Sequence, residues 1–229
     1  MNIKPAADLD QWHLARWSRF TASENYKLLV GNGSNMFGAG AMTYIEEKVL
    51  QMTTQMWERP EMEENKTLLH GKIYEYPAYK YYVNTTGNTN MIYLGDETPL
   101  FLEYEPLAKD SGGSPDAITI ISGGVVGLGV EIKCPKNPMV HFNRVRKWKT
   151  MWDLKENYNQ CYTQIQNLMM ITGAKQWDFI SYDERQIDPN KKGKIIEVFT
   201  DQKFQDNLEL RLRMAVKEKY RIYEEYMNS

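Results

Sequence analysis

The sequence of 229 residues predicts an α+β (mixed α/β) fold in which a central mixed β-sheet is flanked by helices. Three features predict it. Apolar residues recur at helical spacing in the first third of the chain. Short β-rich runs, divided by glycine, proline, serine and aspartate, follow between residues 90 and 134. A helix, two strands and a long charged helix then complete the chain, an order typical of helices packed on a sheet.

The N-terminal elements are expected to be helices joined by polar segments. Thr21 and Glu24 stand three positions apart, as in a capping box, and predict a helix over residues 21–30 that ends at Gly31. The glycine-rich residues 31–40 predict a loop, and the polar residues 58–67 an exposed connection. A helix is expected over 69–83, which Pro77 either kinks or forces to restart. A further helix is expected over 41–57, between the loop over 31–40 and the connection over 58–67. Five apolar residues at helical spacing predict it: Met42, Ile45, Val49, Met52 and Met56.

The middle of the chain predicts an antiparallel meander. Its strands are the runs NMIYLG (90–95), PLFLEY (99–104), DAITIIS (116–122) and VVGLGVEIKC (125–134). Helical spacing then returns over 150–172, through Leu154, Tyr158, Cys161, Ile165 and Leu168. Two further strands are expected at WDFISYD (177–183) and KIIEVFT (194–200). A helix over 201–228 places four apolar residues on one side: Phe204, Leu208, Leu212 and Ala215.

The composition excludes several classes of protein. Hydrophobic residues make up 42% and charged residues 25%, which excludes a disordered chain. The length predicts one domain over residues 1–229. Two cysteines, Cys134 and Cys161, exclude a disulfide scaffold, a four-cysteine zinc site and an iron–sulfur cluster. The sequence shows no signal peptide and no apolar run of roughly 20 residues, so we expect no membrane association and a reducing, cytoplasmic location. With a formal net charge of −2, a protein acting on DNA must concentrate its cations locally.

The most informative residues are Asp116 and, after fourteen intervening residues, the string Glu131-Ile132-Lys133. Alternation along a strand places Glu131 and Lys133 on one face and points Ile132 into the core. If Asp116 begins the neighbouring strand, its carboxylate meets that of Glu131. Two carboxylates and the Ile132 carbonyl suit Mg²⁺ or Mn²⁺, and a nearby ammonium can orient a metal-bound water for attack on a phosphodiester. The other interpretation is a Glu–Lys pair on an exposed strand face.

Three further features favour the functional interpretation. Glu75 lies on the predicted helix ahead of the sheet, and Gln164 falls at the margin of an apolar stripe, where it can reach a cleft. Ser23 is expected in the first turn of the helix over 21–30, where unpaired N–H groups suit a phosphate, and Arg16 could add a bidentate contact. The structural alternatives are a solvated acid, a boundary glutamine and an ordinary capped helix with a surface arginine.

Seven motifs stand in one order along the chain: Trp12-His13-x-x-Arg16, Thr21-Ala22-Ser23, Gly71-Lys72-x-Tyr74-Glu75, Ser114-Pro115-Asp116, Glu131-Ile132-Lys133-Cys134-Pro135, Gln164-x-Gln166 and Ser181-Tyr182-Asp183. This series resembles that of the phage lambda-type exonucleases, also called YqaJ-like viral recombinases. They are a branch of the PD-(D/E)xK nuclease superfamily, which has a restriction-endonuclease-like core. The resemblance runs from about residue 11 to about 185. It implies a nuclease core over about 11–200, followed by the C-terminal helix over about 201–228.

The resemblance implies a metal-dependent deoxyribonuclease, a 5′→3′ exonuclease that degrades one strand of linear double-stranded DNA for homologous recombination. Such an enzyme uses two Mg²⁺ ions, for which Mn²⁺ would substitute. By resemblance, Asp116, Glu131 and the carbonyl of Ile132 would be metal ligands, and Glu75 would support the second metal.

The same resemblance assigns roles around the reacting phosphate. Lys133 would position the attacking water, and Gln164 would support it. Arg16, Ser23 and Ser114 would hold the 5′-phosphate of the DNA end. The family also implies a ring-shaped homotrimer, a single-strand annealing protein as partner and a bacterial host cytoplasm. Relatives carry a lysine or arginine in the loop after the first helix, whereas residues 31–40 contain none, so we expect a weaker grip on the 5′ end.

The path of the DNA is left open by the sequence. The densest basic run is HFNRVRKWKT (141–150), with Arg144, Arg146, Lys147 and Lys149 around Trp148. It could grip the DNA backbone, stack Trp148 on an unpaired base, or be a solvated basic turn.

Three alternatives to the exonuclease stay open. A Cas4-like exonuclease would normally have four cysteines, and a restriction-type endonuclease would need a base-reading element that the sequence does not reveal. A non-catalytic scaffold that binds DNA ends would not need the intact acids and lysine of the motif.

Overall fold

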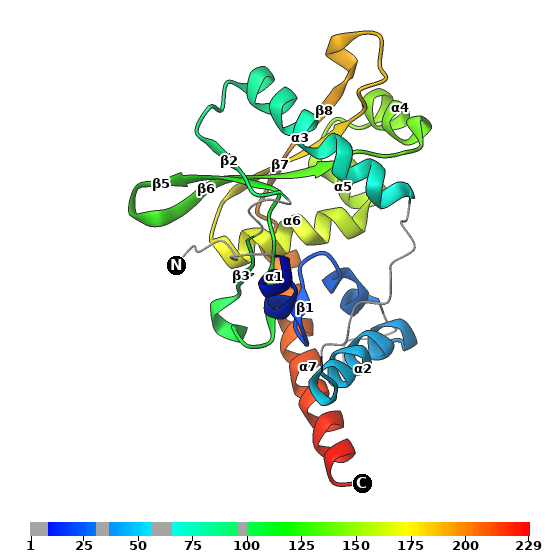
Figure 1. The fold of residues 1–229 in the computed structure, drawn as a ribbon, viewed down its shortest axis with the longest axis vertical. Coiled ribbons are helices and arrows are strands. Elements are labelled where there is room, and N and C mark those ends of the chain that lie inside the picture. Colours follow the sequence, from blue (N-terminus) through cyan, green and yellow to red (C-terminus); the bar gives the residue numbers. More distant parts are fainter. Residues whose placement is uncertain (1–8, 31–36, 56–65, 96–99) are drawn as a thin grey trace.

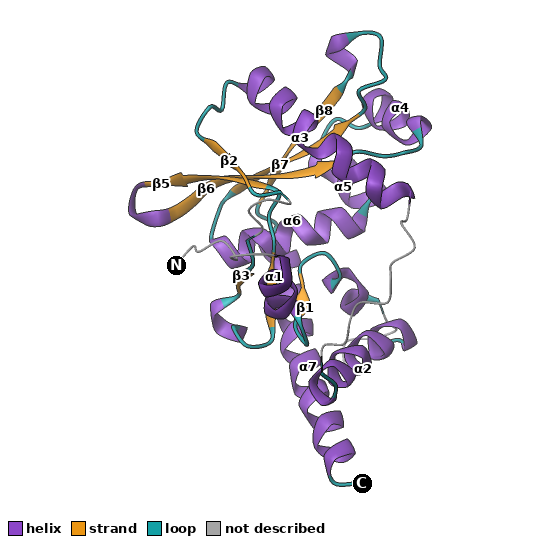
Figure 2. Cartoon of the chain, in the orientation of Figure 1, coloured by secondary structure: helices purple, strands orange, loops and turns teal. Residues whose placement is uncertain are grey.

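A five-stranded mixed sheet forms the centre of the computed structural model, which describes residues 9–30, 37–55, 66–95 and 100–229 (Figure 1). The strand order is β2-β5-β6-β7-β8, in which β6 and β7 are parallel and the other neighbours antiparallel (Figure 2). This arrangement confirms the predicted mixed sheet. The strands are β2 (Met91–Tyr93), β5 (Ala117–Ile121), β6 (Val125–Lys133), β7 (Gln176–Tyr182) and β8 (Gly193–Phe199).

A second, three-stranded sheet was not predicted. Its order is β1 (Phe20–Thr21), β4 (Ser111–Gly113) and β3 (Leu102–Glu103). The expected meander is therefore wrong at PLFLEY, because β3 pairs with β4 and not with the strands of the larger sheet. The two- and three-residue strands are too short to show an alternating pattern in the sequence.

Helices cover both faces of the larger sheet. On one face, Ala78 and Tyr82 of α3 (Lys66–Thr86) pack against Val130, Ile132 and Ile180. On the other face lies α6 (Asn159–Thr172), whose apolar side packs on alternate strand residues that include Phe179. Helix α3 continues through Pro77, so of the two alternatives expected there, a restart or a kink, the restart is wrong.

The connection between the parallel strands β6 and β7 contains α4 (Pro138–Lys147), α5 (Met151–Asn157) and α6. A single helix over 150–172 was predicted, but the helix is interrupted at Tyr158, whose φ of −148° and ψ of 57° are not helical. The basic run is mostly helical, so its interpretation as a solvated turn is wrong. Trp148 is buried in the core beside α6 and is not available to stack on a base.

The predicted α-helix over 21–30 is also wrong. Thr21 pairs with Gly112 in the small sheet, and only a short 3₁₀ helix follows, at Asn25–Leu29. The backbone N–H of Thr21 donates to the Tyr44 hydroxyl at 3.0 Å. Strand pairing and this tertiary bond therefore override the local capping signal, although the side chains of Thr21 and Glu24 do meet at 3.4 Å.

The remaining helices are α1 (Leu9–Arg16), α2 (Ala39–Thr53) and α7 (Gln202–Met227). Helices α2 and α7 pack together through a separate apolar cluster, and α7 extends beyond the sheets (Figure 1). The first residues of the predicted 31–40 loop, Gly31 included, and the connection up to residue 65 lie outside the described residues. Among the described residues, no helix has both the length and the apolar character to cross a bilayer.

Candidate active site

Asp116 and Glu131 lie side by side where β5 begins. The pairing of Ala117 with Val130 sets the two acids next to each other on neighbouring strands. The backbone N–H of Ile132 donates to Asp116 Oδ2 at 2.7 Å. Glu131 has no exposed surface, and its Oε1 forms an ion pair with Lys133 Nζ. Within the described residues, Glu131 Oε2 is buried without a hydrogen-bond partner, so one carboxylate oxygen is left for a ligand.

Asp116, Glu131 and Lys133 are ionisable groups that lie close together in a poorly solvated place, so the pKa of each one is shifted by the charge of another. Burial, and then the charge of Asp116, raise the pKa of Glu131 to about 8. Burial also raises the pKa of Asp116. Burial alone would lower the pKa of Lys133, but the charges of Glu131 and Asp116 outweigh it and raise that pKa well above its usual value. The lysine therefore stays charged at neutral pH. One ammonium cannot balance two ionised carboxylates, so a further cation would stabilise the charged form of Asp116 and Glu131.

A cavity of about 1030 Å³ opens in front of these residues. It is bounded by α3, the segment after β6, α4 and the start of α6. Several of the predicted site residues line it: Ser23, Glu75, Ile132, Lys133 and Gln164. We call this cavity the cleft. Asp116 and Glu131 do not line it and lie behind Lys133.

Glu75 and Gln164 reach the cleft from helices on opposite faces of the sheet. The Tyr93 hydroxyl donates to Glu75 Oε1 at 3.0 Å and so fixes this carboxylate at the cleft wall. The charge of Glu75 adds a smaller contribution to the raised pKa of Glu131. Gln164 is 9% exposed, so only the end of its side chain is open to the cleft. Glu75 thus lies on the helix ahead of the sheet and Gln164 reaches the cleft, the two positions that the sequence analysis expected of them.

The donors present suit a hard divalent cation. They are the carboxylates of Asp116 and Glu131 and the carbonyl of Ile132, and oxygen ligands of this kind favour Mg²⁺ or Mn²⁺. The buried and unpartnered Glu131 Oε2 fits such an ion. Across the described ranges, no three histidine, cysteine, aspartate or glutamate side chains gather closely enough to hold a metal. The structure therefore does not bring Glu75 together with the two other acids.

Comparison with known proteins decides the family. The sequence profile of the YqaJ-like viral recombinase domain matches residues 11–175. The chain belongs to the YqaJ-like viral recombinase family. This confirms the resemblance found in the motifs. No curated protein sequence matches the chain.

Solved structures of exonucleases have a fold similar to that of this YqaJ-like protein. An alkaline exonuclease from Laribacter hongkongensis has a TM-score of 0.73 at 21% identity, with 96% of each chain covered. The same enzyme in complex with dAMP gives 0.72 at 22% identity, again with 96% of each chain covered. A phage-related exonuclease from Haemophilus somnus 129PT gives 0.66 at 16% identity, covering 91% of this chain and 96% of the other. With its family and this PD-(D/E)xK-like fold, the chain is a nuclease acting on DNA.

The residues expected at the 5′-phosphate are partly gathered in the YqaJ-like fold. Ser114 Oγ accepts from Arg16 Nη1 at 3.3 Å and from Trp12 Nε1 at 2.9 Å. The Arg16 guanidinium also lies 4.3 Å from the centre of the Trp12 ring. Neither Arg16 nor Ser114 lines the cleft, whereas Ser23 does. Ser23 precedes a short 3₁₀ helix, so the expected contribution of an α-helix N-terminus at this point is wrong.

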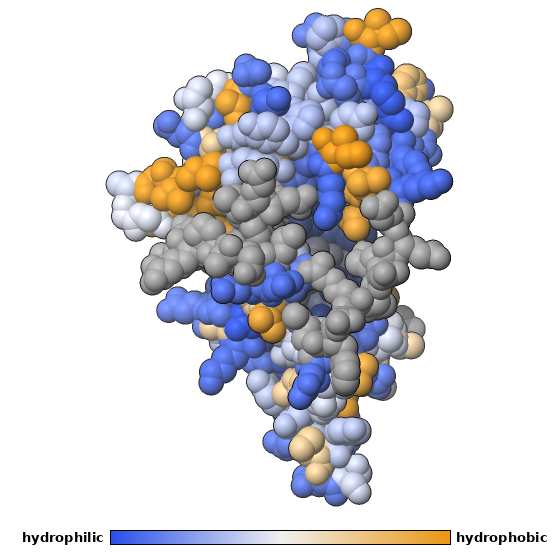
Figure 3. All heavy atoms as spheres, in the orientation of Figure 1, coloured by the Kyte–Doolittle hydropathy of each residue, from blue (hydrophilic) through white to orange (hydrophobic). Residues whose placement is uncertain are grey.

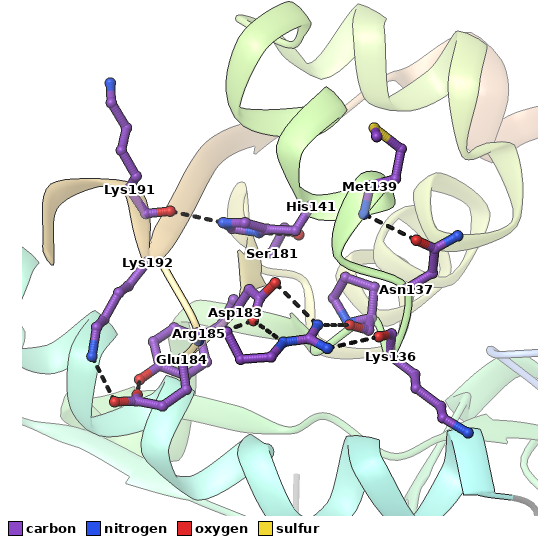
Figure 4. Close-up of polar contacts among 12 residues, drawn as sticks. Lys136, Asn137, Met139, His141, Ser181, Asp183, Glu184, Arg185, Lys191 and Lys192 are labelled. Atoms are coloured by element: carbon purple, nitrogen blue, oxygen red, sulfur yellow. Dashed lines mark hydrogen bonds and ion pairs between the residues drawn. The ribbon is translucent and has the colours of Figure 1, made fainter. Parts of the chain in front are cut away.

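Arg185 holds the wall of the cleft and was missed by the sequence analysis. Its guanidinium donates to Asp183 Oδ1 at 2.7 Å and to the carbonyls of Lys136 at 3.1 Å and Pro135 at 3.3 Å. Figure 4 shows this side chain reaching from Asp183 to the loop that carries Lys136 and Asn137. The Ser181-Tyr182-Asp183 motif therefore fixes the segment that follows Lys133. The motif marked Asp183, but nothing in the sequence pairs it with Arg185.

His141 ties α4 of the YqaJ-like domain to β7 (Figure 4). Its Nε2 lies 2.8 Å from the Lys191 carbonyl and its Nδ1 lies 3.0 Å from Ser181 Oγ. Because a carbonyl only accepts, Nε2 carries the proton and Nδ1 accepts from the serine hydroxyl. Burial lowers the pKa of His141, in keeping with this neutral form. His141 thus fixes Ser181, which also accepts from Arg144 at 3.2 Å.

Proposed function

We propose that the chain is a Mg²⁺-dependent 5′→3′ exonuclease that degrades one strand of linear double-stranded DNA during homologous recombination. The observation that carries the proposal is the buried pair of Asp116 and Glu131 beside Lys133, with one glutamate oxygen unpartnered at the back of the cleft. The family and the exonuclease fold support the same reaction class. The direction of digestion rests on the resemblance of the motifs.

Asp116, Glu131 and the Ile132 carbonyl would hold the metal, with Glu75 supporting the second of two Mg²⁺ ions and Mn²⁺ as a substitute. When bound, the metal supplies an acidified water and neutralises charge on the phosphodiester. Lys133 holds its ammonium at the cleft against Glu131, where it orients the attacking water and stabilises negative charge that develops on the phosphate. Gln164 lines the same cleft and supports that water.

The DNA end would be held beside the cleft. Arg16 and Ser114 already share a hydrogen bond, and Ser23 lies at the cleft wall. A terminal phosphate would accept charge-assisted hydrogen bonds from the Arg16 guanidinium and from the hydroxyls of Ser23 and Ser114. The contact between Arg16 and Ser114 supports recognition of a 5′-phosphate without a helix terminus.

The proposal extends to the assembly and the setting of the protein. A single nuclease domain over residues 1–229 would work in a bacterial cytoplasm with a single-strand annealing protein. The homotrimer rests on the resemblance of the motifs, and association in general is supported by apolar side chains that Figure 3 shows gathered over the β5–β6 hairpin. Ile121 and Val125 of this hairpin are each at least 48% exposed, Ile92 of the neighbouring β2 is 44% exposed, and such patches mark association surfaces.

Linear duplex DNA is expected to be degraded in Mg²⁺, whereas covalently closed circular DNA survives, because digestion begins at an end. The measurement incubates the protein with end-labelled linear duplex and with closed plasmid, with Mg²⁺ or with EDTA. EDTA should stop the reaction. Rapid cutting of closed circles would instead identify an endonuclease, and binding without any cleavage would identify a scaffold.

A 5′-phosphorylated end is expected to be digested about tenfold faster than a 5′-hydroxyl end. A hydrogen bond to a charged group is worth roughly 1.5–3 kcal/mol, and about 1.4 kcal/mol is one decade in rate. Arg16→Ala should erase most of this preference. Arg19→Ala is the matched control, because Arg19 pairs with Glu103 at 2.7 Å instead. Equal initial rates of the unmodified protein on the two ends would show that Arg16 is only structural.

A further inference from the structure

A second cavity adjoins the cleft on the side of α4. Its volume is about 300 Å³, and it shares Val140, Arg144 and Tyr158 with the cleft. The shared residues make the two cavities neighbours along one surface. The polar side chains on the far side of the second cavity are Asn143, Lys147 and Asn157. Of the described residues that line it, none is an aspartate or glutamate, so its charge is positive.

Arg144, between the two cavities, is a buried cation without an anion. It is 6% exposed, and no carboxylate in the described parts of the chain forms an ion pair with it. Its guanidinium is held by Ser181 Oγ and lies 4.9 Å from the centre of the Tyr158 ring and 5.1 Å from that of Trp148. Its Nε is buried without a hydrogen-bond partner. Aromatic faces stabilise a cation only in part, so Arg144 is prepared for an anionic ligand.

Helical phase separates the members of the basic run. Arg144 and Lys147 stand three residues apart on α4 and therefore share a side, and both line the second cavity. Arg146 points elsewhere: it is exposed, does not line either cavity, and lies over the Phe142 ring at 5.6 Å. Only part of the basic run thus faces the route into the cleft.

We propose that the second cavity binds a backbone phosphate of the DNA strand that enters the cleft, with Arg144 and Lys147 as its ligands. This rests on the proposed function, because the strand is the substrate of the cleft. The phosphate meets the guanidinium, which has no carboxylate partner in the described parts of the chain, where Arg144 borders the two cavities, while Ser181 and the aromatic rings hold the side chain in place. Lys147 adds a second charge at the rim. Asn143 and Asn157 are uncharged and polar, so they do not repel a phosphate.

The test measures binding without cleavage. The full chain is titrated onto a fluorescently labelled linear duplex in EDTA by anisotropy, at several salt concentrations, for the unmodified protein and three variants. Each lost phosphate contact should lower the slope of log affinity against log salt by about 0.9. Lys147→Gln should show that loss, whereas Arg146→Gln, its exposed neighbour with the same change of charge, should keep the slope. Arg144→Gln should lower the slope and weaken binding about tenfold or more.

Thermal melts show whether each variant is folded. If Arg144→Gln does not fold, the comparison of Lys147→Gln with Arg146→Gln still decides, because both side chains are exposed. Equal slopes for these two variants would overturn the proposal, as would a folded Arg144→Gln that binds like the unmodified protein. Failure of the proposed function would look different: the unmodified protein would not cleave linear duplex in Mg²⁺, whatever the slopes in EDTA.

Discussion

Replacing Lys133 with alanine is expected to abolish cleavage of linear duplex DNA while binding of that DNA persists. Lys133 lines the cleft and is held there by Glu131, and in the proposed function its ammonium would act on the water and the reacting phosphate more than on the grip of the DNA. Loss of one positioned proton-transfer or charge-stabilising group costs about 10²–10⁴ in rate. The measurement is the single-turnover rate on end-labelled duplex in Mg²⁺, with anisotropy for binding in EDTA.

Two controls make the result specific to the cleft. Lys175→Ala removes an exposed lysine just ahead of β7, at the end of the sheet away from Lys133, and should cleave at the normal rate. In calorimetry, Lys133→Ala should still take up Mg²⁺, whereas Glu131→Ala should lose the heat of metal binding. A Lys133→Ala protein that cleaves at a near-normal rate would place the active site elsewhere.

The hairpin that carries the site follows from the sequence. Two β-rich runs with a short glycine-containing turn between them predict β5 and β6, and alternation along β6 predicts that Ile132 enters the core while Glu131 and Lys133 share the other face. The second, smaller sheet could not be predicted from these β-rich runs. Thr21 pairs with Gly112, about ninety positions away, and no local pattern reports a partner at that distance.

Buried charges are the other part that sequence reasoning could not reach. Arg144 and Lys219 sit in helices rich in charged residues, where charge usually marks the solvent side. Their hydrogen-bond partners come from remote segments: Ser181 for Arg144, and Asp110 and the Ser18 carbonyl for Lys219. Arg185 is exposed, but two of its acceptors, the carbonyls of Pro135 and Lys136, also lie in a distant segment, the loop after β6. In each case the deciding contact forms only when distant segments meet.

Loss of the Lys219 ammonium is expected to lower the free energy of unfolding by about 3–5 kcal/mol, the usual cost of breaking a buried ion pair. Lys219 is 1% exposed on α7, and its Nζ donates to Asp110 and to the Ser18 carbonyl, the latter at 3.1 Å. Lys219→Met keeps the apolar stem but leaves the mostly buried Asp110 carboxylate without this partner. The bond also joins α7 to the segment that leads into β1, so its loss weakens the link between the terminal helix and the small sheet. Urea unfolding followed by circular dichroism measures the change.

A second substitution separates the ion pair from simple packing. Adding Asp110→Leu to Lys219→Met removes the stranded carboxylate, and replacing both partners of a buried pair by apolar groups is often nearly neutral, so most of the lost stability should return. Arg213→Ala is the exposed control on the same helix: Arg213 pairs with Glu209 four residues away at 2.6 Å, and its loss should cost only about 0.3–0.5 kcal/mol. If Lys219→Met costs no more than Arg213→Ala, the buried pair contributes no more than a surface pair, and other contacts hold α7 in place, among them the cluster that Leu208, Leu212 and Ala215 form with Phe20 of β1.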